Sequence, residues 1–189
     1  MRGDRGFTLL ELVVSVALWG LVAAAGAAVV ASVVRLASAA KRWSEAEHHA
    51  RTVLERIMVS LRAAGYGAVD RLSIADRSRV EYLADFSADP AGPERRGFYL
   101  GSDGVLREIS GSSVSPLTTQ EQGFRVSSFE LAYFDRDGLE LGPPPLDAER
   151  RRRVSRVRIR AAFDFTDVRQ TWRQLAVEEH VAVRLAGEE

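Results

Sequence analysis

The sequence predicts an α+β fold, in which a long N-terminal helix lays its second half on an antiparallel β-sheet. Three observations predict this fold. Residues 12–34 contain no charged side chain. Residues 35–64 place their apolar side chains three or four positions apart, which is the spacing of one helical face. The remaining residues form short apolar runs separated by glycine and aspartate turns, a pattern typical of strands.

The first expected element is a single helix from about Phe7 to about Ala64. Its uncharged run of 23 residues, 12–34, is long enough to cross a bilayer, which takes about 20 apolar helical residues. No proline precedes Pro90, so nothing forces a break. Glycines at positions 65 and 67 supply a stop signal. At a rise of ~1.5 Å per residue the helix would be roughly 87 Å long, so part of it must lie outside a small domain.

The second half of this helix offers one apolar stripe to cover a sheet. A sheet with one apolar face needs such a cover. The stripe consists of Leu36, Ala39, Trp43, Ala46, Ala50, Val53, Ile57, Leu61 and Ala64.

The expected sheet elements follow from residue 65 onward. Two hairpins are predicted, one turning at residues 102–104 and one at 135–138. The clearest strand is 154–165, and a final strand at 175–186 is interrupted by Glu178 and Glu179. The prolines at 143–145 and the arginines at 150–153 indicate a loop. In the clearest strand, alternate residues point one way: Val157, Ile159, Ala161, Phe163 and Phe165.

Composition argues against an enzyme. The formal net charge is +0, so the chain as a whole has no electrostatic bias toward nucleic acid. The chain has no cysteine, so a Cys–His site is excluded. The segment Glu-Ala-Glu-His-His at 45–49 has metal-ligand residue types, but it lacks the two histidines four positions apart that would face one zinc ion. We interpret it as a solvated helix face, and the sequence predicts no catalytic residue and no cofactor.

The N-terminus carries a specific motif. A short basic leader, residues 1–6, precedes Gly6-Phe7-Thr8-Leu9-Leu10-Glu11 and the apolar run. This arrangement resembles the processing site of type IV prepilins and of type II secretion prepseudopilins. The resemblance implies cleavage between Gly6 and Phe7 by a prepilin peptidase, N-methylation of Phe7, and a role for Glu11 in assembly. Such proteins usually carry a helix-kinking proline near the position of Ala28, so no kink is expected here.

Two further segments resemble PilW-type minor pilins and J-type minor pseudopilins: residues 50–67 and 129–138. The resemblance implies a pilin-like fold with a leader at 1–6, a transmembrane and assembly helix at 7–34, and a periplasmic domain at 35–189, helical to about residue 64 and a sheet from 65 onward. It implies a single-pass inner-membrane protein that later joins a pilus or pseudopilus, in its initiation or tip complex. Its partners would be the prepilin peptidase and other minor and major pilins or pseudopilins.

Alternatives remain beside this interpretation. The N-terminus could be a secretory signal cleaved within residues 23–28, or a plain anchor of a periplasmic protein; the first places Glu11 in an unfavourable apolar region, and the second gives it no partner. The arginines at 150–153, with Arg156, Arg158 and Arg160, could touch DNA, as in an uptake pilus, but the net charge makes nucleic acid a weaker expectation than an acidic neighbouring subunit.

One possible ion site remains. Asp135, Asp137 and Glu140 could hold calcium, which binds clustered carboxylate oxygens. The same residue types also suit a tight turn, which is the simpler interpretation.

Overall fold

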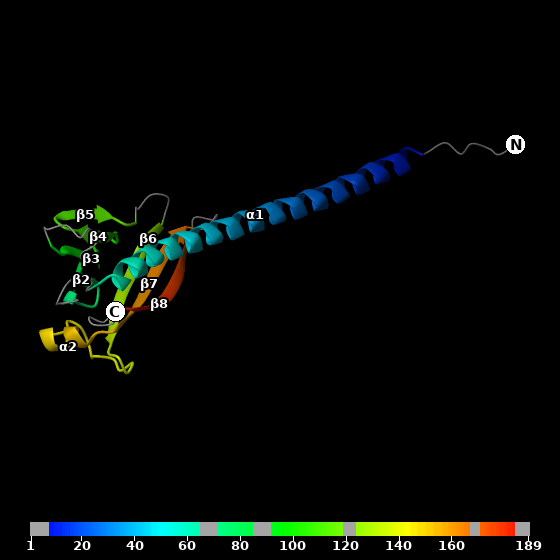
Figure 1. Ribbon diagram of the computed structural model, residues 1–189. Helices are drawn as coiled ribbons and strands as arrows, with labels where there is room; N and C mark the ends of the chain where they lie inside the picture. Colours follow the sequence, from blue (N-terminus) through cyan, green and yellow to red (C-terminus); the bar gives the residue numbers. More distant parts are fainter. Residues whose placement is uncertain (1–7, 65–71, 85–91, 119–123, 167–170, 184–189) are drawn as a thin grey trace. The chain divides into compact units, whose positions relative to one another are not determined.

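The structure is a computed structural model that describes residues 8–64, 72–84, 92–118, 124–166 and 171–183. The chain divides into two compact units, Met1–Trp43 and Ser44–Glu189, and each is described by itself. Helix α1 (Leu9–Arg62) contributes residues to both units (Figure 1).

In the first unit, the described residues belong to the start of α1. The helix continues as α-helix past Ala28, so the expected absence of a break is confirmed. No described residue of this unit is buried, and α1 is long and apolar enough to cross a membrane. The hydroxyls of the two serines in the apolar run donate to carbonyls of the same helix: Ser15 Oγ to Glu11 O at 2.7 Å and Ser32 Oγ to Val29 O at 2.7 Å. The helix therefore satisfies its own polar groups, as a lipid environment requires.

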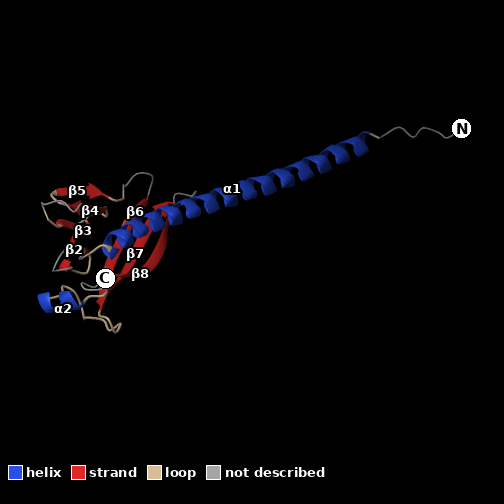
Figure 2. Ribbon diagram, viewed as in Figure 1, coloured by secondary structure: helices blue, strands red, loops and turns tan. Residues whose placement is uncertain are grey.

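In the second unit, the described strands form two antiparallel sheets rather than the one expected (Figure 2). The five-stranded sheet has the order β1-β2-β3-β4-β5, and the three-stranded sheet has the order β6-β7-β8. The strands are β1 (Leu72–Ala75), β2 (Arg79–Ala84), β3 (Glu94–Leu100), β4 (Leu106–Ser110), β5 (Ser113–Pro116), β6 (Phe124–Phe134), β7 (Arg156–Thr166) and β8 (Trp172–Ala182).

The predicted hairpin at 102–104 is confirmed as the connection between β3 and β4. The second predicted hairpin is reduced to one bridge, Phe134 to Glu140, and β6 pairs with β7 along almost its whole length. Strand β7 is the clean strand that the sequence predicts. Strand β8 is not interrupted by its glutamates: Glu178 lies opposite Arg160 and accepts two hydrogen bonds from its guanidinium, at 3.0 and 2.6 Å. A cross-strand ion pair explains why a carboxylate fits within this strand.

One hydrophobic core joins the second part of α1 to both sheets. The helix contributes Ala50, Leu54, Ile57 and Leu61 to this core, all 0–1% exposed. The predicted stripe is therefore correct at its C-terminal end. Its first members are not covered in the structure: Leu36 is 73% exposed.

Polar contacts fix α1 and the two sheets around this core. The Tyr82 hydroxyl of β2 hydrogen-bonds to Ser60 of α1, and burial raises the pKa of the Tyr82 phenol to about 12. The Tyr133 hydroxyl of β6 donates to the backbone carbonyl of Asp76 at 2.8 Å, which ties the three-stranded sheet to the turn after β1.

Arginines 150–153, expected in a loop, belong instead to the short helix α2 (Ala148–Arg153). Asp147 caps it: one carboxylate oxygen accepts from Arg150 N at 2.8 Å, and the other from the Arg150 guanidinium at 2.8 Å. The first of these bonds caps the helix, and the second holds the Arg150 side chain against the same carboxylate. Together they explain why this charged segment is helical.

Candidate functional site

The candidate site lies at the start of α1. Gly6 and Phe7, the predicted cleavage and methylation positions, lie outside the described residues. Thr8 and Glu11 are described, and they contact each other across the first helical turn. Glu11 Oε2 accepts hydrogen bonds from Thr8 N at 3.0 Å and from Thr8 Oγ1 at 3.1 Å, while Thr8 Oγ1 accepts from Glu11 N at 3.3 Å.

This reciprocal pattern is a capping box. The side chain of the residue that caps a helix accepts from the third residue of the helix, whose own side chain accepts from the backbone of the cap. The Thr8 carbonyl also accepts the first intrahelical bond, from Leu12 N at 3.2 Å. The predicted assembly residue, Glu11, therefore already has a partner within its own chain. Thr8 is the capping residue that was not among the predicted site residues, although the spacing Thr-x-x-Glu before an apolar run is a sign of this cap.

The surface of α1 beyond this cap is apolar and exposed. Leu9, Leu18, Trp19 and Leu21 are each more than half exposed. A contiguous apolar surface of this size indicates a lipid or protein partner. The small residues at 23–28 allow another helix to approach closely, as they do where helices meet in membranes.

The possible calcium residues form a turn that the protein itself stabilises. Asp135 is 7% exposed, and its Oδ1 accepts from the backbone amides of Asp137, at 3.1 Å, and Leu139, at 2.9 Å. Its Oδ2 forms an ion pair with Arg153 at 3.1 Å. Within the described ranges, no group of three or more His, Asp or Glu side chains is placed to hold a metal ion. The turn accounts for Asp135 without an ion, and calcium binding at Asp137 and Glu140 stays a prediction.

The candidate DNA-contacting arginines are largely engaged within the chain. Arg160 pairs with Glu178 at 2.6 Å, and its hydrogen bond holds the pKa of Glu178 below the ordinary value. The Arg158 guanidinium lies over the Phe134 ring, 5.3 Å from its centroid. Arg150 and Arg153 pair with Asp147 and Asp135. Arg150, Arg153 and Arg160 thus each have a carboxylate partner within the chain, which reduces the positive charge that they offer to a phosphate backbone.

Comparisons with known proteins agree with the geometry at the helix start. Residues 1–27 match the family model described as the prokaryotic N-terminal methylation motif. The fold is similar to that of a type IV-like pilin from Thermus thermophilus, with a TM-score of 0.53 and 13% sequence identity over 72% of this chain and 94% of that chain. A search of curated proteins found no match.

The motif and the fold are independent observations. The motif rests on residues 1–27, whereas the structural likeness covers most of the chain and, at 13% identity, concerns the fold alone. A motif of this kind implies processing by a prepilin peptidase and assembly with other pilins. This chain thus carries a prokaryotic N-terminal methylation motif at its start and has a fold similar to that of a type IV-like pilin.

Proposed function

We propose that the chain is a minor pilin or minor pseudopilin that takes part in the initiation or tip complex of a fibre. A prepilin peptidase cleaves between Gly6 and Phe7, and Phe7 is N-methylated. The observation that carries this proposal is the Thr8–Glu11 cap at the start of an exposed apolar helix, within the matched methylation motif. The looser resemblance of residues 50–67 and 129–138 to minor subunits supports the minor role.

Before assembly, the apolar part of α1 spans the inner membrane and the second unit lies in the periplasm. Arg2 and Arg5 of the leader stay on the cytoplasmic side, as the positive-inside tendency favours. On assembly the apolar helix leaves lipid and packs against the helices of other subunits.

Glu11 sets the axial register of this packing. A charge in the middle of a span costs about 2.5–3.5 kcal/mol on insertion scales and less near its edge, where Glu11 lies. After cleavage, Phe7 carries a cationic amine. The amine of a neighbouring subunit, offset along the fibre axis, meets Glu11, and the pair offsets the desolvation of both charges. Register is the best-attested role of such a buried polar pair.

A DNA-uptake pilin is the other candidate. Arg150, Arg153 and Arg160 already form ion pairs with carboxylates of the same chain. DNA phosphates would have to replace these carboxylates, so the ion pairs do not favour DNA binding. Salt-dependent retention of DNA by the second unit would support this candidate.

The test uses full-length chains expressed in membranes that contain the peptidase and the other pilins of the same system. Glu11→Leu should insert and be cleaved before Phe7, as the mass of the mature N-terminus reports, but it should recover several-fold less of the partner pilins on purification. Ser15→Ala is the matched control, because Ser15 lies one turn further along and bonds only to its own helix. Undiminished recovery with Glu11→Leu would contradict the register role, and a Gly6→Glu chain cleaved normally would contradict the processing site.

A further inference from the structure

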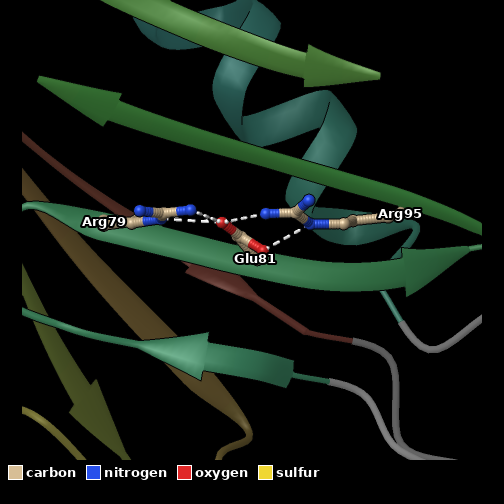
Figure 3. Close-up of polar contacts among 3 residues, drawn as sticks. All are labelled: Arg79, Glu81 and Arg95. Atoms are coloured by element: carbon tan, nitrogen blue, oxygen red, sulfur yellow. Dashed lines mark hydrogen bonds and ion pairs between the residues drawn. The ribbon is translucent and has the colours of Figure 1, made fainter. Parts of the chain in front are cut away.

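One carboxylate of the five-stranded sheet is held between two arginines (Figure 3). Glu81 on β2 is only 2% exposed. Its Oε1 accepts from Arg79 Nε at 2.7 Å and from Arg95 Nη2 at 2.9 Å, and its Oε2 accepts from Arg95 Nε at 2.6 Å; Arg79 Nη2 also donates to Oε1. Burial raises the pKa of Glu81, but the hydrogen bonds from Arg95 and Arg79 outweigh it and leave the pKa below the ordinary value. The carboxylate is therefore ionised at neutral pH.

The strand register brings the two guanidiniums to this carboxylate. Glu81 lies opposite Gly97 of β3. A Cβ at Gly97 would lie 2.4 Å from the Val80 carbonyl oxygen and 2.9 Å from Glu81 Cγ, so the absence of a side chain there makes room for the glutamate. Arg79 precedes Glu81 by two residues and Arg95 precedes Gly97 by two, which places all three side chains on one face of the sheet.

This face is the one turned away from α1. Val80 and Tyr82, the neighbours of Glu81 along β2, are fully buried, and Tyr82 bonds to Ser60 of α1. Since successive side chains of a strand alternate between faces, Glu81 points to the opposite side.

The cluster carries more positive than negative charge. Two guanidiniums share one carboxylate, which leaves a net charge of about +1, because arginine stays protonated at all ordinary pH values. The Arg79 and Arg95 side chains are 41% and 49% exposed. Each guanidinium has five N–H donors, and in the described part of the chain each points only two nitrogens at Glu81. Donors therefore remain on the solvent side of both groups.

The two guanidiniums are also held in place. The buried carboxylate fixes their inner edges, and Arg79 lies over the Tyr99 ring, 5.6 Å from its centroid. A receptor whose side chains are already ordered loses less conformational entropy when a ligand binds. Guanidinium forks suit carboxylates, which accept two parallel hydrogen bonds.

We propose that Arg79 and Arg95, positioned by Glu81, form a receptor for a carboxylate on an acidic segment of a neighbouring fibre subunit. The inference rests on the proposed role as a fibre subunit and names the chemistry of one contact. A compact excess of one charge suits a single acidic side chain. A nucleic acid would instead need a row of positive charges along its phosphates.

The experiment titrates the full-length, isotope-labelled chain in neutral detergent with a short blocked peptide that contains two glutamates. The same peptide with glutamines, inorganic phosphate, an anionic lipid added to the micelles and an oligonucleotide are the comparison probes. We expect saturable shifts of the Arg79 and Arg95 Nε–H resonances with the glutamate peptide alone. Arg95→Gln should weaken the affinity about ten-fold, the loss of a strong charged contact.

Arg125→Gln is the matched control. Arg125 is 53% exposed and pairs one-to-one with Asp164 at 3.1 Å, so it contributes no charge excess, and its loss should leave the affinity unchanged. If Arg95→Gln fails to fold, Arg95→Lys is the second variant, because lysine keeps the charge but lacks the guanidinium fork. The titration of the unaltered chain tests the proposal in either case.

Three results would overturn the proposal: no saturable shift, equal shifts with the glutamine peptide, or preferential binding of phosphate, the anionic lipid or the oligonucleotide. None of them would touch the fibre role, because that role is tested separately by the recovery of partner pilins with Glu11→Leu.

Discussion

Two glutamates of this chain, Glu11 and Glu81, differ in whether their hydrogen-bond partners are close in the sequence or are brought near by the pairing of strands. Glu11 lies on the exposed first turn of α1 and bonds to Thr8 three residues earlier, so its contacts are local. Glu81 lies in the five-stranded sheet and bonds to Arg79 and Arg95, the latter from another strand. Local spacing can therefore predict the contact of Glu11, whereas the Glu81 contacts depend on strand register.

The Glu81 cluster gives the stability of the fold a pH dependence. The pKa of Glu81 is below its ordinary value of 4.5 in the folded chain, so the ion pairs stabilise the fold fully above that value. This stabilisation is lost as the pH falls through the folded pKa. We expect the thermal midpoint of the full-length chain to fall between about pH 7 and about pH 3, and to fall less in Glu81→Gln. Parallel curves for the two chains, measured by circular dichroism, would show that Glu81 is not a source of the acid sensitivity.

The distinction between contacts within one short segment and contacts made by strand pairing explains which site residues the sequence predicts. Gly6, Phe7 and Glu11 form a continuous motif, and the spacing of Thr8 and Glu11 contains the signal for the cap as well. The Glu81 cluster has no comparable signal, because Arg95 follows fourteen residues later and meets Glu81 only through the pairing of β2 with β3.

At the scale of elements, periodicity predicts the second half of α1 and strand β7 well, because each buries one side. It does not predict how the strands divide between sheets. The turn at Asp135 has the residues of a hairpin turn, but the segments on its two sides form only one bridge, and the long partner of β6 is β7. The arginines of α2 have no apolar period, and their helix depends on the Asp147 cap.

The buried side of α1 can be tested with two neighbouring positions. Ile57 is 0% exposed, and Val59, two residues later, is 57% exposed. Ile57→Asp places an unpaired carboxylate in the core and should lower the free energy of unfolding by several kcal/mol. Val59→Asp should change it by less than about 0.5 kcal/mol. Denaturant midpoints of the two variants measure the difference, and equal midpoints would mean that Ile57 does not face the sheets.

At the scale of the whole molecule, the boundary between the two units falls later than the end of the apolar run. The sequence places it after Val34, where charged residues begin. The compact second unit begins at Ser44, because burial on α1 begins only at Ala46. The first charged residue after the apolar run marks the end of the candidate membrane span, and the first buried residue of α1 marks the start of the folded domain. Only the first of these two positions can be identified from the sequence alone.

A truncated chain tests this boundary. The fragment Ser44–Glu189 keeps every buried residue of the described structure, so it should be soluble and should unfold in one cooperative transition. A fragment that starts at Arg35 should melt at nearly the same temperature, because residues 35–43 bury no side chain. A clearly lower midpoint for the shorter fragment would show that residues 35–43 contribute to the fold.

The Thr8–Glu11 cap has a consequence for the reuse of subunits. A helix end in lipid must have its amides and its charge engaged, since no water is present to replace a lost partner. A subunit whose glutamate depended wholly on a neighbour would return to the bilayer with a frayed end. Here Thr8 takes up the carboxylate within the same chain, and Glu11 in turn holds the Thr8 amide. If the chain acts as the proposed fibre subunit, this local cap would let it return from a fibre to the membrane with its helix end intact.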